Sequence, residues 1–134
     1  MQTYSPMILQ IDKNDSLKTF QQQFNANYPF LKIEFFKKIS IDKPSIDLSI
    51  SLKTNSEKNI NEFKNGFVNI DVNRKKTITE LEKDFEKLLG LSARVFRKSG
   101  NVWVETSITN DWSLEDQNEE GKLISSHFSD KHTK

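Results

Sequence analysis

The side chains best suited to binding chemistry lie between residues 91 and 109, in the stretch LSARVFRKSGNVWVETSIT. Phe96, Arg97, Lys98 and Trp103 occur close together there and combine aromatic rings with cations. Aromatic rings stack on nucleic-acid bases while cations contact phosphates, and aromatic residues and Arg are also enriched in the cores of protein interfaces. These residue types indicate a binding surface and leave its partner open.

Catalytic and metal-binding motifs are missing from the sequence. The chain contains no Cys, which excludes disulfides, thiolate catalysis and Cys-based zinc sites. The histidines are His127 and His132, both near the C-terminal end. HExxH, Walker, GxGxxG and GxSxG patterns do not occur, and the acidic residues between 111 and 120 lack the spacing of a calcium loop. We therefore expect a protein without enzymatic activity, cofactor or metal.

The stretch 91–109 alternates in the way that a β-hairpin requires. A two-residue turn could lie at Ser99-Gly100 or at Gly100-Asn101, and both turns give the same two faces because side chains alternate with a period of two. One face is expected to pack against the protein and contains Leu91, Ala93, Val95, Val104, Thr106 and Ile108. The opposite face contains Ser92, Arg94, Phe96, Lys98, Trp103, Glu105 and Ser107.

Hydrophobic periodicity predicts the elements that must position this hairpin. Strands are expected at residues 7–12, 31–38, 45–53 and 67–72, and residues 54–66 form a short helix or an ordered loop. Apolar spacings of three and four predict one helix from residue 17 to Tyr28, where Pro29 ends it. A second helix follows Thr77, which forms a capping box with Glu80, and Gly90 ends it. A short third helix is expected from Ser113 to Gly121.

Residues 7–38 and 67–98 resemble one another as an internal repeat. Each reads strand, helix, strand, and then an aromatic residue followed by two cations, although any two such units look alike at this level. We predict a single α+β domain over residues 1–121, with helices on one side of a mainly antiparallel sheet. Its two βαβ-type units indicate a ferredoxin-like or split-βαβ arrangement. Residues 122–134 are expected to form a flexible tail.

The repeat extends the polar face of the hairpin onto the strand 31–38, where Lys32, Glu34, Phe36 and Lys38 point the same way. We call the combined surface the open face; its candidate binding residues are Phe36, Lys38, Arg94, Phe96, Lys98, Trp103 and Glu105. Three explanations compete for it. The acidic segment 111–120 folds back and covers it, a protein partner or second copy binds it, or single-stranded nucleic acid does.

Composition favours the protein partner over nucleic acid. The net charge is only +1, divided between a basic region at 1–109 and an acidic end at 110–134, whereas nucleic-acid binding usually needs a strongly basic surface. No apolar run is long enough to cross a membrane, and the first residues lack the pattern of a signal peptide. We expect a soluble cytoplasmic protein that acts as an interaction module, with nucleic-acid binding as the alternative.

The order of motifs resembles an uncharacterised family of small bacterial proteins. The residues that carry this resemblance are VFRKSG, the nearby Trp103, and the segment DWSLEDQNEEG, so that it spans roughly residues 77–121. The resemblance implies no activity and no site residues. It implies that the hairpin and the acidic segment occur together as one unit.

Overall fold

The computed structural model describes residues 5–12, 17–38, 49–51 and 67–132, with only the backbone at residues 37–38, 49–51 and 127–132. Its elements are β1 (Ile8–Asp12), α1 (Leu17–Asn27), β2 (Leu31–Lys38), β3 (Ser49–Ser51), β4 (Phe67–Asp71), α2 (Ile78–Leu89), β5 (Ser92–Ser99), β6 (Val102–Glu105) and α3 (Leu114–His132). The predicted α+β class is confirmed. Within these residues, no helix combines the length and apolar character needed to cross a bilayer.

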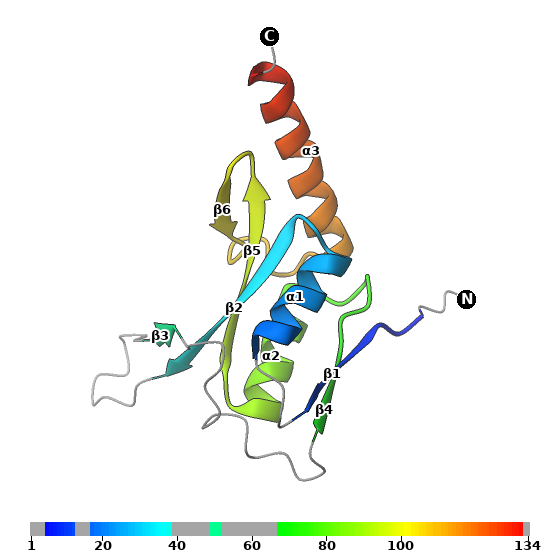
Figure 1. Cartoon of the computed structure of the whole chain (residues 1–134), viewed down its shortest axis with the longest axis vertical. Helices are drawn as coiled ribbons and strands as arrows, with labels where there is room; N and C mark the ends of the chain where they lie inside the picture. Colours follow the sequence, from blue (N-terminus) through cyan, green and yellow to red (C-terminus); the bar gives the residue numbers. More distant parts are fainter. Residues whose placement is uncertain (1–4, 13–16, 39–48, 52–66, 133–134) are drawn as a thin grey trace.

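The strands form two antiparallel sheets, where a single sheet was expected. One is the ladder β1–β4, and the other has the order β3-β2-β5-β6. Figure 1 shows α1 and α2 between the ladder β1–β4 and the larger sheet. The ferredoxin-like or split-βαβ form stays a prediction. The proposed short helix or loop at residues 54–66 lies outside the described residues, as do the ends of the strand predicted at 45–53.

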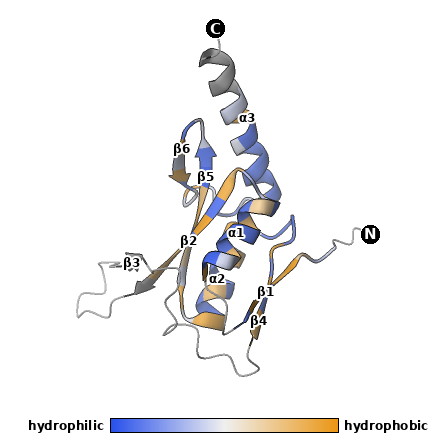
Figure 2. Ribbon diagram, in the orientation of Figure 1, coloured by the Kyte–Doolittle hydropathy of each residue, from blue (hydrophilic) through white to orange (hydrophobic). Residues whose placement is uncertain are grey.

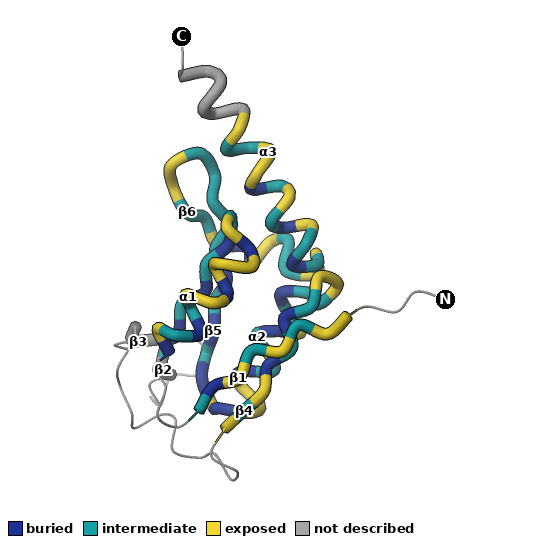
Figure 3. The backbone as a smooth tube through the Cα atoms, turned by 45° about the vertical axis from the view of Figure 1, so that its right-hand side comes forward, coloured by how far each residue is buried: buried dark blue, intermediate teal, exposed yellow. Residues whose placement is uncertain are grey.

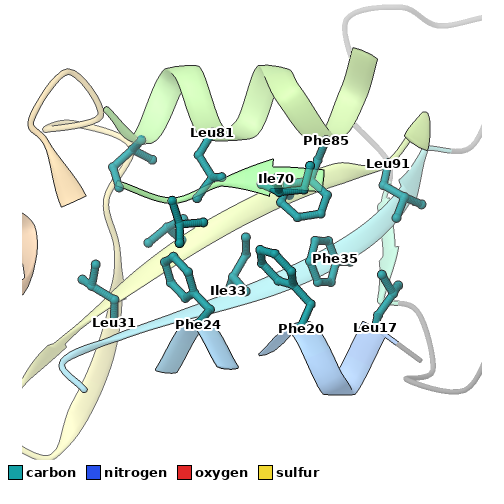
Figure 4. Packing of buried hydrophobic residues seen from close by; sticks show 14 of the residues in the cluster. Leu17, Phe20, Phe24, Leu31, Ile33, Phe35, Ile70, Leu81, Phe85 and Leu91 are labelled. Atoms are coloured by element: carbon teal, nitrogen blue, oxygen red, sulfur yellow. The ribbon is translucent and has the colours of Figure 1, made fainter. Parts of the chain in front are cut away.

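Aromatic side chains from both helices and from the larger sheet meet in the core (Figure 4). The Phe20 ring contacts Phe85 edge-on at 5.0 Å between ring centroids, and Phe35 lies 4.8 Å from Phe85. Edge-on and tilted contacts of this kind add to the gain from burying the apolar area. In Figure 2 the hydrophobic colours concentrate around these helices and strands, whereas the described part of α3 is mainly hydrophilic.

The helix α2 begins and ends as the sequence predicts. The Glu80 backbone N–H donates to Thr77 Oγ1 at 3.1 Å, and the Thr77 backbone N–H donates to Glu80 Oε1 at 3.0 Å, which completes the capping box. Gly90 ends the helix with φ of 66°, in the left-handed region where glycine meets no steric penalty. These local signals therefore set the position of α2 against β5.

The predicted end of the third helix at Gly121 is wrong. Ser113 does cap its start, since its hydroxyl accepts from the Asp116 backbone N–H at 3.1 Å. The helix then continues as α3 through Gly121 to His132, into the region expected to be a tail, and its end extends beyond the β5–β6 hairpin in Figure 1. Gly121 is buried, and a Cβ in its place would lie 2.9 Å from Phe30 Cβ. Figure 3 shows that α3 is buried only along part of its length. The glycine serves close packing here.

The register of β2 and β5 does not test the internal repeat, because any antiparallel ladder maps onto itself when its two strands are exchanged. The predicted alignment makes Ile33 equivalent to Ala93 and Phe35 equivalent to Val95. In the ladder Ile33 lies opposite Val95 and Phe35 lies opposite Ala93, so that exchanging the two units maps one pair onto the other. The strands β1 and β4 also share one burial pattern. A duplication at 7–38 and 67–98 therefore stays a prediction.

Candidate binding surface on the larger sheet

The hairpin turns at Gly100-Asn101. Ser99 lies opposite Val102, Lys98 opposite Trp103 and Phe96 opposite Glu105. Gly100 has φ of 70°, and Asn101 has a negative φ. A positive φ at the first central residue alone is typical of a type II′ turn, whose twist matches that of the flanking strands. This settles the register that the sequence left open between two turns.

The second strand of the hairpin is shorter than predicted. It ends at Glu105, whereas the alternation favoured a strand as far as Thr109. The chain bends just beyond, because Thr109 N–H donates to the Thr106 carbonyl at 3.1 Å. Ile108, expected on the packed face, is therefore 94% exposed. Leu91, Ala93, Val95 and Thr106 are buried as predicted.

Pairing of β2 with β5 assembles the open face from both strands. Lys32 lies opposite Phe96, and Glu34 lies opposite Arg94. Phe36, Phe96 and Trp103 are partly buried on this side, while Phe35 and Val95, which precede the two phenylalanines, are buried in the core. Lys38 pairs through its backbone with Ser49, and its side chain lies outside the described residues.

Lysine side chains lie over the aromatic rings of the open face. Lys32 Nζ is 5.6 Å from the centroid of the Phe96 ring and 5.1 Å from that of Trp103. Lys98 Nζ lies 5.8 Å from the Trp103 centroid. Each such contact contributes roughly 0.5–1 kcal/mol at an exposed site. Two ammonium groups therefore lie close to the indole of Trp103.

Ion pairs complete the open face. Lys32 Nζ lies 3.6 Å from Glu34 Oε2, and Arg94 Nη1 donates to Glu105 Oε2 at 3.2 Å. These pairs are partly exposed, and each contributes little to stability because water screens the charges. Their effect on the charge of the surface is larger than their effect on stability, since they place acidic groups beside the basic ones around the rings. The open face presents mixed charge to a partner.

Arg97 lies apart from the cluster in which the sequence places it. Its Nη1 donates to Gln117 Oε1 at 2.8 Å, and its guanidinium lies 6.0 Å from the Trp112 ring centroid. Gln117 and Trp112 belong to α3 and the segment leading to it, on the side of the sheet that faces the helices. The alternation that sends Phe96 to the open face sends Arg97 to the other one.

The same contacts show that the acidic segment does not cover the open face. Leu114 is buried in the core, and the carboxylate of Glu115 lies 3.3 Å from Lys75 Nζ, near the start of α2. The fold-back explanation for residues 111–120 is therefore wrong. Among the described residues, no element lies across Phe36, Phe96 and Trp103.

A groove beside the open face was missed by the sequence reasoning. It has a volume of about 390 Å³ and lies between α2, the first half of β5 and the segment 105–110. Thr79, Glu82, Lys83 and Glu86 line it from α2. Their spacing of three and four residues marks one face of a helix, beside the buried stripe, and this was the signal available in the sequence.

Glu82 is the most perturbed acid in the groove. Desolvation by burial raises the pKa of its carboxyl from 4.5 to about 7, while Arg94 and a hydrogen bond from the Val95 backbone act in the opposite direction.

In the part of the chain that the structure describes, no group of three His, Cys, Asp or Glu side chains is arranged to hold a metal ion. Comparisons of the chain with protein-family models, with curated proteins and with solved structures found no match.

Proposed function

We propose that this protein is a non-enzymatic interaction module that binds another protein through the open face. The observation that carries the proposal is the arrangement of Phe96 and Trp103 under Lys32 and Lys98, on a sheet face that no described element covers. Aromatic residues are enriched in the cores of protein interfaces, and Trp is among the side chains that contribute most to the binding energy. A partner could bind this preformed surface without the entropic cost of ordering its side chains first.

Mixed charge favours a protein over a nucleic acid as the partner. Glu34 and Glu105 lie beside the cations and would repel phosphates, and the chain has a net charge of +1. The rings are also contacted by lysines, so a base could stack on Trp103 only after displacing an ammonium group. A protein surface can instead pair with acids and bases together.

Nucleic-acid binding remains the second candidate because one observation favours it. Lys32, Arg94 and Lys98 surround Trp103 and Phe96, and a single strand binds to such combinations of rings and cations. Such binding would be strongly weakened by salt, since each phosphate contact releases counterions. Salt dependence therefore separates it from a protein interface with mixed charge.

The test compares the native chain with Trp103→Ala and with the control Ile108→Ala, which shortens a side chain outside the open face. Light scattering measures self-association, and affinity purification with the three chains as baits measures binding to other proteins. We expect a partner or dimer that is retained by Ile108→Ala and lost with Trp103→Ala. Equal behaviour of all three baits would refute the proposal.

The alternative is measured on the same proteins. Fluorescence anisotropy with labelled single-stranded oligonucleotides, at low and moderate salt, should show no binding that depends on Trp103. Tight, salt-sensitive binding that is lost in Trp103→Ala would replace the protein partner with nucleic acid.

A further inference from the structure

The strand β6 forms one outer edge of the larger sheet. It ends the strand order β3-β2-β5-β6, and in Figures 1 and 3 it lies on the side of the hairpin away from α3. The strand stops at Glu105 because a carbonyl of the following segment bonds to the start of α2, where the Thr79 N–H donates to the Asn110 carbonyl at 2.9 Å. The first N–H groups of a helix need such partners from outside it. The edge is therefore short, and its end is fixed by the body of the protein.

The backbone groups of Trp103 and Glu105 point outward from this edge. The Thr106 N–H donates to the Val95 carbonyl of β5 at 3.2 Å. Backbone groups of every second residue point to the same side of a strand, so those of Val104 also face β5. The alternate residues, Trp103 and Glu105, turn their N–H and C=O groups away from β5. In the described part of the chain, no strand lies on that side to pair with them.

This edge carries little of the protection that exposed strand edges usually have. Natural proteins guard such edges with Lys, Pro or β-bulges. The sequence NVWV at residues 101–104 contains no charge and no Pro, and β6 pairs with β5 residue by residue without a bulge. Val102 is 54% exposed, and the side chain of Glu105 is 42% exposed. Another strand can therefore reach the edge.

A second copy of the chain fits this edge in one register. When two β6 strands pair antiparallel about a two-fold axis at Val104, Trp103 of each copy lies opposite Glu105 of the other. Opposite residues whose backbone groups face each other exchange both N–H···O bonds. Each outward N–H and C=O of one β6 then meets a counterpart on the other. A two-fold contact requires this kind of self-complementarity, in which one patch binds its own copy.

The side chains of this register are also complementary. Val104, which is partly buried on the side of the sheet facing the helices, meets Val104 of the second copy as a close cross-strand pair. On the open face, Glu105 lies beside Trp103 of the second copy. The centroid of that ring is 5.1 Å from the Nζ of its own Lys32 and 5.8 Å from that of Lys98. An acid therefore approaches two bases, and the symmetry repeats the contact.

We propose that two copies of this chain pair through the outer edges of β6, with the two-fold axis at Val104, and so join their larger sheets into one. The contact is made by the backbone edge, so it does not depend on the proposed binding of another protein by the open face. So short a contact is expected to bury less than the roughly 1,200 Å² of a stable complex. Association is therefore weak and rises with concentration.

Charge substitutions at Val104 test the position of the axis. Val104→Lys and Val104→Glu each place like charges opposite one another in a pair of identical copies, so each variant alone should be monomeric. An equal mixture of the two should associate, because Lys then faces Glu. Val102→Lys and Val102→Glu are the control pair. Position 102 lies opposite Thr106 of the second copy, so mixing these two should change nothing. Sedimentation equilibrium, at chain concentrations up to about 1 mM, measures the mass against the 15.6 kDa of one chain.

Two substitutions at Glu105 test the backbone bonds. The Glu105 N–H points away from β5, so proline there removes a bond of the dimer and none of the hairpin. Glu105→Ala is the matched control, since both variants lose the carboxylate and only Glu105→Pro loses the N–H. Self-association of Glu105→Pro should be at least about tenfold weaker than that of Glu105→Ala. The Val104 variants keep the inference testable if circular dichroism shows that Glu105→Pro does not fold.

Several outcomes would overturn the inference. They are a native chain that stays monomeric at about 1 mM, a mass that grows beyond two chains, and Val104 variants that do not associate when mixed. A monomeric native chain would leave the edge to an extended segment of a different protein. A dimer that is lost in Trp103→Ala but tolerates Glu105→Pro and Val104→Lys would use the open face instead. Because Val104 lies on the opposite side of the sheet, a failure here is distinguishable from a failure of the proposed function.

Discussion

Replacing Gly121 with alanine tests how α3 is docked against the body. A Cβ at this position would lie 2.9 Å from Phe30 Cβ, 3.1 Å from Arg97 Cγ and 3.2 Å from the Lys98 carbonyl oxygen. The Phe30 Cβ and the Lys98 oxygen belong to or adjoin the backbone, so they cannot rotate away. Alanine therefore requires α3 to move away from the body or the loop at Phe30 to shift.

Two opposing contributions set the magnitude. In a helix interior, alanine is more favourable than glycine by about 1 kcal/mol. Overpacking of a close contact costs roughly 1–3 kcal/mol. The expected net effect of Gly121→Ala is a loss of about 1 kcal/mol in the free energy of unfolding. If α3 did not contact the body, the same change would be a gain of about 1 kcal/mol, and the two cases differ in sign.

Urea unfolding followed by circular dichroism measures this difference, with Ser126→Ala at an exposed position of α3 as the control for helix propensity. Local undocking of α3 would register separately as increased quenching of Trp112, whose ring lies beside Arg97. A Gly121→Ala chain that is more stable than the native chain, with unchanged quenching, would refute the described docking. It would also reopen the question of what covers the open face.

Three further predictions concern α2 and the core. Thr77→Ala should lower the free energy of unfolding by about 1 kcal/mol in urea, because the capping box with Glu80 is lost; an unchanged midpoint would contradict this. Tyr28→Phe should cost roughly 1–2 kcal/mol, since the Tyr28 hydroxyl donates to the buried Val72 carbonyl at 2.6 Å. Burial raises the pKa of Tyr28 from its ordinary value of 10.0 to about 12, so an ultraviolet titration that ionises this phenol near 10.0 would contradict the burial. Burial also raises the pKa of Glu82 from 4.5 to about 7, so the native chain retains a proton that the unfolded chain releases, and stability should fall as pH rises through this range. Glu82→Gln should remove that fall and be more stable above pH 7 by about 1 kcal/mol, a value reduced for solvent screening; parallel stability curves for the two chains across this range would argue against it.

Local patterns were sufficient for α2 and for the two faces of β5. The capping box at Thr77 and the glycine at Gly90 define α2 through contacts within a few residues. The alternation at 91–98 separates Val95 from Phe96 whatever the turn, because the side-chain period of a strand does not depend on its neighbours. The sequence therefore separated the two sides of the hairpin, whereas the strand order that joins β2 to this surface came from the structure.

The role of Arg97 shows where such reasoning stops. Its nearness in sequence to Phe96 and Lys98 suggested one cluster, yet its side chain bonds to Gln117, twenty residues away. The early end of β6 was missed for the same reason, because it also depends on residues far apart in the chain. Apolar alternation continues to Ile108, but the carbonyls of the following segment are needed by the start of α2.

The sequence by itself determined the α+β class, the helix α2 with its caps, and the alternation that creates the open face, because these depend on short-range periodicity and capping. Only the tertiary structure decided that α3 lies on the helix side, that Gly121 serves close packing, and that β6 ends at Glu105. These features depend on hydrogen bonds and contacts between residues far apart in the chain. The groove beside α2 exists for that reason, since it forms where a long-range bond to α2 draws the chain away from the sheet.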